Sequence, residues 1–316
     1  MSTIGSSPSA APTTDEAGYL RRLQRPTGPV DVVLDTDAFN EIDDMYAIAY
    51  LLRSTEKLRC QAIYAAPFSN RKAATPAIGM QKSHDEILRI LGLMGLPGLS
   101  GIVRRGSEVY LADEATAVPS DAARDLAERA MGYAPDRPLY VVAIGAITNV
   151  ASALLLRPEI ADRIVVVWLG GHAFGWPNNR EFNCYQDVAA ARVVMDSGVA
   201  LVLLPCKGVV SAFTTTGPEL ECHLRGRNEL CDYLVDVTTR EALETSGKPT
   251  WSRPIWDVTA VAWLLDGDFM QDRLVPCPIP EYDDRYAFDA TRRLIRYVYY
   301  IKRDNLFQDL FEKLAR

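Results

Sequence analysis

The sequence has few histidines, no paired cysteine motif and no long apolar run. Its three histidines, His84, His172 and His223, and its six scattered cysteines do not have the spacing of a zinc site. No apolar run reaches the roughly 18 residues of a transmembrane helix, so no membrane span is expected. Residues 1–17 lack the apolar stretch of a secretory signal. We therefore expect reduced cysteines and a cytoplasmic location.

The sequence also has fewer basic than acidic residues. Lys and Arg total 34 against 41 Asp and Glu, which gives a formal net charge of −7. An acidic chain is a poor general binder of nucleic acids or anionic membranes, so neither partner is expected. Hydrophobic residues make up 48% of the 316 residues, which is enough for a substantial core. A small-molecule ligand remains compatible with this composition.

Short apolar segments alternate with helical patterns along the chain. The expected strands are Val30–Leu34, Leu58–Ala65, Leu139–Ile144, Arg163–Leu169, Ala200–Leu204 and Arg293–Ile301. The expected helices include Asp43–Arg53, Pro76–Leu93, one opening at Thr148, Val188–Met195, Glu229–Leu243 and Ile255–Leu265. This alternation is typical of an α/β fold with a mostly parallel central sheet flanked by helices, a Rossmann-like core. We expect a flexible N-terminal tail over residues 1–27 and a single domain over residues 28–316.

The strongest motif is the acidic segment 35–44 (DTDAFNEIDD), which directly follows the first expected strand. Ligands of such sheets bind beyond the carboxyl ends of the strands, so this segment is expected at the binding edge. Five carboxylates within ten residues repel one another and favour a hard divalent cation bound through oxygen. A simpler interpretation makes them caps and turns, with Asp43 opening a helix.

A second functional interpretation of this segment is a phosphatase. A strand that ends in Asp35-Thr36-Asp37 is similar to the opening of haloacid-dehalogenase-type phosphatases, and Asp268 with Asp272 could mimic their later acidic motif. Against this, Phe39 stands where those proteins carry Thr or Val.

Three further polar segments follow expected strands or open a helix. They are Gly145–Asn149 (GAITN), the loop from Gly170-Gly171-His172 to Glu181-Phe182-Asn183, and Trp256-Asp257. Two glycines allow a sharp turn and a close approach to a ligand. Each segment taken alone has an equally good structural explanation as a turn or a helix cap.

Together, in this order, the four segments resemble the inosine–uridine preferring nucleoside hydrolase family. The family motifs DxDPGxDD, Gly-x-Leu-Thr-Asn, Gly-Gly with Glu-Phe-Asn, and His-Asp correspond here to DTDAFNEIDD, GAITN, GGHAFGWPNNREFN and Trp256-Asp257. The resemblance covers roughly residues 30–266. It implies a nucleoside-hydrolase-like fold and calcium-dependent hydrolysis of the N-glycosidic bond of a ribonucleoside or related N-ribosyl compound, giving ribose and free base.

The resemblance also implies roles for individual residues. The Ca²⁺ ligands would be Asp37, Asp44, Asp257 and the carbonyl oxygen of Thr148, and Asp37 would also take the proton of the attacking water. The substrate-binding residues would be Asp43, Asn70, Asn178, Asn179, Glu181, Asn183, Trp176 and Trp256. His172 is a possible proton donor to the leaving group. Family members are often oligomers, which implies a homodimer or homotetramer.

Two departures from the family pattern affect the expected chemistry. Residues Ala38–Ile42 replace the Pro-Gly segment and make the loop two residues longer, so Asn40 or Glu41 can enter the site. Trp256 replaces the late histidine, and an indole cannot serve as an acid. The alternative to an enzyme is therefore a pseudoenzyme that keeps the metal site and binds a ribosyl ligand without cleaving it.

Overall fold

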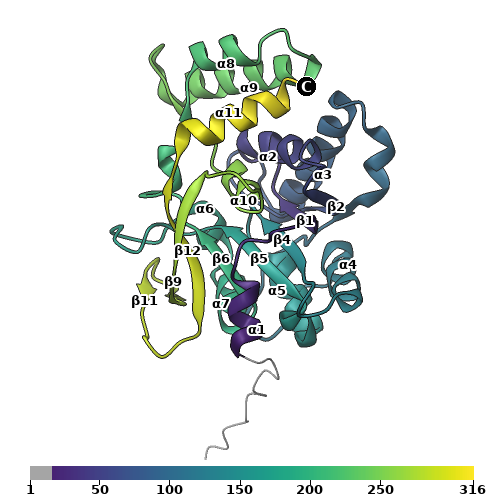
Figure 1. Ribbon diagram of the computed structural model, residues 1–316, viewed down its shortest axis with the longest axis vertical. Helices are drawn as coiled ribbons and strands as arrows, with labels where there is room; N and C mark the ends of the chain where they lie inside the picture. Colours follow the sequence, from purple (N-terminus) through teal and green to yellow (C-terminus); the bar gives the residue numbers. More distant parts are fainter. Residues whose placement is uncertain (1–15) are drawn as a thin grey trace, which may run out of the picture.

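A computed structural model describes residues 16–316 of the chain, and an eight-stranded sheet runs through the middle of the molecule (Figure 1). In spatial order its strands are β3 (Val103–Arg105), β2 (Leu58–Ala65), β1 (Val30–Thr36), β4 (Leu139–Ala143), β5 (Ile164–Leu169), β6 (Ala200–Leu204), β12 (Leu294–Ile301) and β9 (Met270–Pro276). Neighbouring strands are parallel except β9, which pairs antiparallel with β12. The mostly parallel sheet predicted from the sequence is confirmed.

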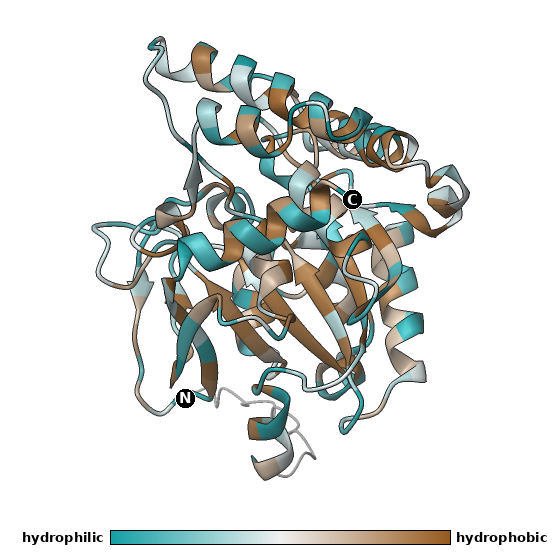
Figure 2. Ribbon diagram, turned by 45° about the horizontal axis from the view of Figure 1, so that its top comes forward, coloured by the Kyte–Doolittle hydropathy of each residue, from teal (hydrophilic) through white to brown (hydrophobic). Residues whose placement is uncertain are grey.

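Helices cover both faces of this sheet (Figure 2). Side chains of β1 alternate between the two layers, because Val32 and Leu34 belong to one apolar cluster and Val33 to the other. The first layer contains α2 (Asp43–Leu52), α3 (Pro76–Leu93), α8 (Gly217–His223), α9 (Glu229–Ser246), α10 (Val258–Ala262) and α11 (Arg303–Leu314). The second contains α4 (Asp121–Arg129), α5 (Thr148–Leu156) and α7 (Val188–Asp196).

The strand order reverses direction between β1 and β4. From β1 the chain proceeds to β2 and β3 on one side, and from β4 it proceeds to β5 and β6 on the other. The connections after β1 and β4 therefore diverge and leave a crevice at the carboxyl ends of the strands. The acidic segment 35–44 begins within β1 and continues into this crevice.

The N-terminal part of the described chain is structured rather than a tail. Helix α1 (Glu16–Arg22) packs on the domain, with Tyr19 and Leu23 buried and the Tyr19 hydroxyl donating to the Leu294 carbonyl at 2.7 Å. The prediction of a flexible tail to residue 27 is therefore wrong over residues 16–22, because two apolar side chains anchor the helix. Residues 1–15 lie outside the described residues.

Short elements complete the fold. The strand pairs are β7 (Thr214–Thr215) with β8 (Arg253–Pro254), and β10 (Ile279–Pro280) with β11 (Tyr286–Ala287). The remaining helical turns are α6 (Phe182–Gln186), η1 (Pro97–Ile102), η2 (Ala130–Gly132), η3 (Pro158–Asp162) and η4 (Val210–Ala212). Between residues 16 and 316, every helix is too short or too polar to cross a lipid bilayer.

Candidate functional site

The carboxyl ends of the central strands surround a cavity of about 270 Å³. Its walls combine segments that are far apart in sequence: Asp37, Asn40, Glu41, Asp43, Asp44, Ile144, Leu169, His172, Arg180, Glu181, Phe182, Asn183, Tyr185, Cys206, Lys207, Arg253, Trp256 and Asp257. The cavity therefore lies where the reversal of strand order predicts a ligand.

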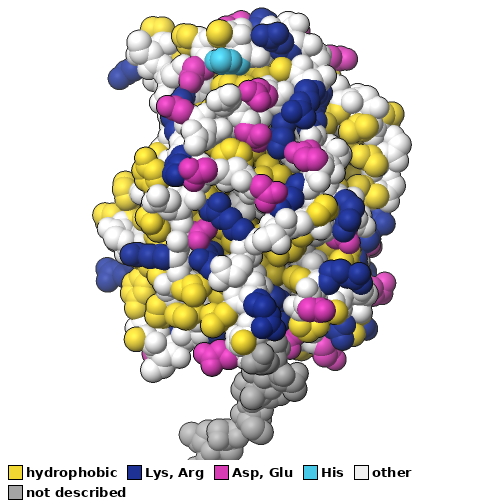
Figure 3. Space-filling view, viewed as in Figure 1, with side chains coloured by type: hydrophobic (Ala, Val, Ile, Leu, Met, Phe, Trp, Pro, Cys, Tyr) yellow, Lys and Arg dark blue, Asp and Glu magenta, His cyan; other side chains and the backbone are white. Residues whose placement is uncertain are grey.

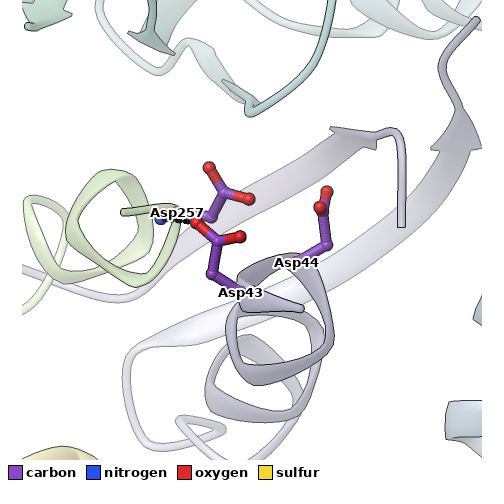
Figure 4. Close-up of side chains that lie close together, drawn as sticks. All are labelled: Asp43, Asp44 and Asp257. Atoms are coloured by element: carbon purple, nitrogen blue, oxygen red, sulfur yellow. Dashed lines mark hydrogen bonds between the residues drawn. The ribbon is translucent and has the colours of Figure 1, made fainter. Parts of the chain in front are cut away.

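Three buried carboxylates of the cavity wall lie close together (Figure 4). Asp43 and Asp44 form the first turn of α2, and Asp257 immediately precedes α10. One carboxylate oxygen from each of the three residues lies within 4.8 Å of the others. The Asp257 backbone N–H also donates to Asp43 Oδ2 at 3.2 Å, which fixes the approach of two residues 214 positions apart.

Asp37 adjoins this group from the end of β1. Its Oδ1 lies so near Gly145 that a Cβ atom at that position would be 3.1 Å away, so the glycine gives the carboxylate room. Asp37 Oδ2 and Asp43 Oδ1 are buried and have no hydrogen-bond partner within residues 16–316. Buried carboxylate oxygens without donors are costly. With Asp44 and Asp257, these two side chains form an oxygen donor set that suits a hard divalent cation.

The pKa shifts of the four acids also favour a bound cation. Burial raises the pKa of Asp37, Asp43 and Asp257 well above the ordinary range, and repulsion among the carboxylates adds to the shift. Burial raises the pKa of Asp44 to about 7, although its Oδ1 accepts a hydrogen bond from the Thr36 hydroxyl at 2.5 Å. A bound cation would offset the repulsion and hold these carboxylates in their charged form.

Asp35 supports the acidic group from behind without lining the cavity. Its Oδ1 accepts a hydrogen bond from Asn149 Nδ2 at 2.7 Å, while Asn149 Oδ1 accepts from the Ser107 N–H at 2.8 Å. At the start of α5, the Thr148 hydroxyl donates to Asp187 Oδ2 at 2.7 Å. The Thr148 side chain is thus engaged away from the cavity, and the role of its carbonyl oxygen as a metal ligand stays a prediction.

The loop after β5 places Glu181 and Asn183 in the cavity wall, where the sequence analysis expected them. The Glu181 carboxylate caps α6 and accepts hydrogen bonds from the N–H groups of Gly171 (2.9 Å), Asn183 (3.0 Å) and Cys184 (3.0 Å). Burial raises its pKa to about 7, and these three donors oppose the shift. Asn183 Nδ2 donates to the carbonyls of Ile144 and Leu169, which leaves Asn183 Oδ1 as the atom able to accept from a ligand.

His172 and Trp256 also line the cavity. The Lys207 backbone N–H approaches His172 Nδ1 at 3.4 Å. Burial and the positive charge of Lys207 together lower the pKa of His172 to about 4. The imidazole is therefore neutral at neutral pH.

Four of the proposed substrate-binding residues lie outside the cavity wall, among the residues described. The Trp176 side chain is 43% exposed, with its ring centroid 6.1 Å from that of His172. Asn179 Oδ1 accepts from the His172 N–H at 2.8 Å, and Asn178 Oδ1 accepts from the Arg180 N–H at 3.0 Å. Asn70 donates a hydrogen bond to Asn40 in the segment that follows β1. These amides hold loops in shape.

The lengthened loop 38–42 is held by a set of charges and amides. Asn70 Nδ2 donates to Asn40 Oδ1 at 2.8 Å, and Lys72 Nζ donates to the Asn40 carbonyl at 2.6 Å. Arg253 pairs with Glu41 at 3.4 Å and with Glu241 at 2.6 Å. Asn40 and Glu41 both line the cavity, as the altered motif suggested.

Arg180, Lys207 and Arg253 line the cavity but were missed by the sequence analysis. Lys207 had a usable signal, because it comes three residues after the end of β6 and strand ends mark the binding edge. Arg253 lies on the two-residue strand β8, and no pattern in the sequence predicts that it lines the cavity.

The acids of the phosphatase interpretation do not reach the cavity. Asp268 pairs with Lys302 at 2.5 Å, and Asp272 pairs with Arg25 at 2.9 Å and with Arg296 at 3.0 Å. Neither aspartate is among the cavity residues, so the phosphatase alternative loses its support.

Comparison with known sequences gives a consistent result. Residues 32–293 match the family model described as inosine-uridine preferring nucleoside hydrolase. The pyrimidine-specific ribonucleoside hydrolase RihB of Escherichia coli is 29% identical over 142 residues, covering 43% of this chain and 44% of that protein. The chain thus spans only about half the length of the curated relatives that it matches.

Comparison with solved structures shows the same fold over nearly the whole chain. The purine-preferring ribonucleoside hydrolase from Gardnerella vaginalis has a TM-score of 0.74 at 20% identity, covering 90% of this chain and 98% of that one. The plant nucleoside hydrolase PpNRh1 has a TM-score of 0.71 at 20% identity, covering 91% and 99%. With the family model matched over most of its length and the acidic motif in place, the chain belongs to the inosine-uridine preferring nucleoside hydrolase family.

Proposed function

We propose that this protein hydrolyses the N-glycosidic bond of a ribonucleoside or a related N-ribosyl compound, with the help of Ca²⁺, and releases ribose and the free base. The observation that carries the proposal is the convergence of buried Asp43, Asp44 and Asp257, beside Asp37, at one end of a cavity of about 270 Å³. The relatives named as ribonucleoside hydrolases support the same reaction class.

The carboxylates of Asp37, Asp44 and Asp257, with the carbonyl oxygen of Thr148, are the proposed Ca²⁺ ligands. Their fit rests on the buried Oδ2 of Asp37, which lacks a donor, and on the raised pKa values of the three acids. When bound, Ca²⁺ would orient the attacking water and the 2′ and 3′ hydroxyls of the ribose.

Asp37 is the proposed general base. Its unpartnered Oδ2 is available to accept the proton of the water as the water attacks the anomeric carbon. Hydrolysis of this bond passes through a ribosyl cation with oxocarbenium character, and nearby carboxylates stabilise its positive charge. Asp43 and Asn183 line the cavity, and we propose that they accept hydrogen bonds from ribose hydroxyls.

Leaving-group activation is the weak part of this site. Trp256 offers an aromatic surface on which a base can stack, but its indole has no acidic proton to give. His172 is neutral at neutral pH, so it offers at most a hydrogen bond rather than a full proton. The proposal therefore favours substrates whose leaving groups depart with little acid assistance.

A pseudoenzyme that binds a ribosyl ligand is the second candidate, because Trp256 occupies the place of the family's late histidine. It predicts binding of nucleosides without release of ribose. A homodimeric or homotetrameric assembly and a cytoplasmic location belong to the main proposal and rest on the family resemblance and composition.

The deciding experiment measures free ribose from purified protein incubated with inosine, uridine, cytidine and 4-nitrophenyl β-D-ribofuranoside. The nitrophenyl compound is included because its leaving group needs no acid. We expect turnover that stops with a calcium chelator and returns when Ca²⁺ is added in excess. Binding of these compounds without any ribose release would favour the pseudoenzyme. An absence of both binding and ribose release would exclude both candidates.

A further inference from the structure

The cavity wall contains more acidic than basic side chains. Among the described residues, six carboxylates line the cavity, against the three cations Arg180, Lys207 and Arg253. Two of these cations are already paired with acids outside the wall. Arg180 pairs with Asp284 at 2.8 Å, and Arg253 pairs with Glu241 at 2.6 Å. Lys207 is exposed, so water and salt screen its charge. One divalent cation would therefore leave the wall negative when its acids are charged.

Glu41 is the acid that the lengthened loop 38–42 adds to the cavity wall. Its negative charge helps to raise the pKa of each of the four buried aspartates, so it lies within electrostatic reach of all of them. Within residues 16–316 its one ion pair is with Arg253, at 3.4 Å, and the same guanidinium nitrogen lies closer to Glu241, at 2.6 Å. Glu41 is not a proposed Ca²⁺ ligand. Its charge therefore remains available to a positively charged ligand.

The cavity wall also offers aromatic surface, in Phe182, Tyr185 and Trp256. The Arg180 guanidinium carbon lies 4.5 Å from the centroid of the Tyr185 ring, so one ring of the wall already contacts a cation. No Lys or Arg within residues 16–316 lies over the Trp256 ring. Indole is the aromatic side chain that attracts cations most strongly. Trp256 thus suits a flat ring that carries positive charge.

The lack of an acid in the cavity favours the same kind of ligand. When the glycosidic bond of a neutral nucleoside breaks, the electron pair stays on the base, which leaves as an anion unless an acid protonates it. An aromatic base that is already cationic leaves as a neutral molecule and needs no proton. Neither Trp256 nor the neutral His172 supplies a proton. A cationic leaving group is the class that does not need the missing acid.

We propose that the preferred ligand of this site is an N-ribosyl compound with a positively charged aromatic base, such as an N-ribosylpyridinium, whose ring stacks on Trp256 and whose charge is balanced by Glu41. The inference rests on the proposed function, which makes this ligand the substrate. Hydrolysis breaks the bond between the anomeric carbon and the ring nitrogen, and the electron pair of that bond neutralises the ring. The water oxygen bonds to the anomeric carbon, and its proton passes to Asp37 and then to solvent. The products are ribose, a neutral pyridine and one proton.

Binding is tested with two ring compounds that cannot be hydrolysed. 1-Methylnicotinamide is a pyridinium cation, and nicotinamide is the same ring without the charge. Isothermal titration calorimetry measures both on the Ca²⁺-loaded protein in excess D-ribose. We expect the cation to bind about 10-fold more tightly, because ionic and cation–π contacts favour it. In Glu41→Gln this ratio should fall several-fold. Glu128→Gln, which removes an exposed negative charge on α4 outside the cavity, should retain it.

Catalysis is tested with a matched pair of substrates. N-ribosylnicotinamide carries the cationic ring, and its 1,4-dihydro form has nearly the same shape but is neutral. After correction for spontaneous hydrolysis, we expect a kcat/KM for the cationic compound at least about 10-fold above those for inosine and uridine, since these need acid assistance. The dihydro form should not be hydrolysed above background. Glu41→Gln should raise KM for the cationic compound more than KM for inosine.

The outcomes separate this inference from the proposed function. Equal binding of the two ring compounds, an unchanged ratio in Glu41→Gln, or a higher kcat/KM for inosine or uridine overturns the inference even though nucleosides are hydrolysed. A Glu41-dependent preference for the cation supports the inference even if no compound is hydrolysed, in which case the hydrolase proposal fails alone. Added salt gives a measurement that needs no variant, because it should lower the same ratio in the wild type. A ratio that salt leaves unchanged also overturns the inference.

Discussion

At the scale of single residues, the site contains acids that differ in how well their oxygens are satisfied. Asp35 and Glu181 are held by side-chain or backbone donors, which assigns them to supporting the loops around the cavity. Asp37 has a buried oxygen without a donor and faces the other acids. Asp35 Oδ2 is also buried without a donor, but Asp35 does not line the cavity, whereas Asp37 does. Access to the cavity is therefore the reason for assigning the reactive role to Asp37 rather than to its neighbour two positions earlier.

Replacing Asp37 with asparagine keeps the shape of the side chain and removes its basicity. We expect Asp37→Asn to lower kcat about 10²- to 10⁴-fold, which is the usual contribution of general base catalysis. Asp31→Asn is the matched control, because Asp31 lies near the start of the same strand and pairs with Arg59. Steady-state kinetics on the best substrate of the nucleoside series measures both. Wild-type turnover by Asp37→Asn would rule out the assigned base.

His172 gives a prediction about acid stability. Its pKa is about 4 in the folded protein and about 6.5 in an unfolded chain, so below pH 6.5 the unfolded state binds a proton that the native state does not. This residue's contribution to stability is full above pH 6.5 and is lost as the pH falls toward 4. We expect His172→Asn to show a smaller decrease in the free energy of unfolding over that range.

Urea denaturation at intervals from pH 7 to pH 4 measures this decrease. Many groups titrate in the same range, so the informative quantity is the difference between the wild type and the variant at each pH. His223→Asn, which removes an exposed histidine, is the control. Parallel curves for the wild type and His172→Asn would show that His172 titrates normally.

At the scale of secondary-structure elements, the sequence predicted best those strands that are buried on both faces. β4, β5 and β6 are entirely buried, and their continuous apolar runs identified them. β9 was missed because it forms the edge of the sheet, where exposed positions carry Gln271 and Arg273. An expected helix over Ile255–Leu265 is only α10 (Val258–Ala262), because Trp256 and Asp257 form the turn into the cavity.

The start of α5 is connected by hydrogen bonds to β1 and to the segment after β3. Asn149 is fully buried and bonds to Asp35 of β1 and to Ser107 after β3. Its replacement by alanine would leave the Asp35 carboxylate and the Ser107 N–H without partners. We expect Asn149→Ala to cost about 2–4 kcal/mol in the free energy of unfolding, in the range for breaking a buried polar network.

Denaturant unfolding measured by circular dichroism tests this cost. Asn305→Ala is the control, because Asn305 is exposed and its one hydrogen bond, to the Asp268 carbonyl, is at the surface. We expect that change to stay within about 0.5 kcal/mol. A loss below about 1 kcal/mol for Asn149→Ala would mean that water replaces the missing amide.

At the scale of the whole molecule, negative charge is distributed unevenly. Figure 3 shows acidic and basic side chains interspersed on one face of the surface. The interior, in contrast, holds Asp35, Asp37, Asp43, Asp44, Asp257 and Glu181 with little positive charge among them. The order of motifs along the chain predicted most of this group, because strand ends of a parallel sheet meet at one edge. Arg253 and Arg180 could not be predicted in the same way, since their positions depend on how distant loops pack.

From this concentration of buried acids we expect the stability of the fold to depend on a bound cation. A metal that binds the native state alone stabilises it by RT ln(1 + [Ca²⁺]/Kd), or about 2.7 kcal/mol at 100 times Kd. We expect excess Ca²⁺ to raise the melting temperature of chelated protein by roughly 4 °C, because an entropy of unfolding of about 2.1 cal/mol/K per residue converts 1 kcal/mol into about 1.5 °C for 316 residues. Asp257→Asn should lose most of the shift, and Asp266→Asn, a change at an exposed aspartate, should keep it. Differential scanning calorimetry with and without chelator measures the shift. An unchanged melting temperature on addition of Ca²⁺ would mean that Asp37, Asp44 and Asp257 do not form its site.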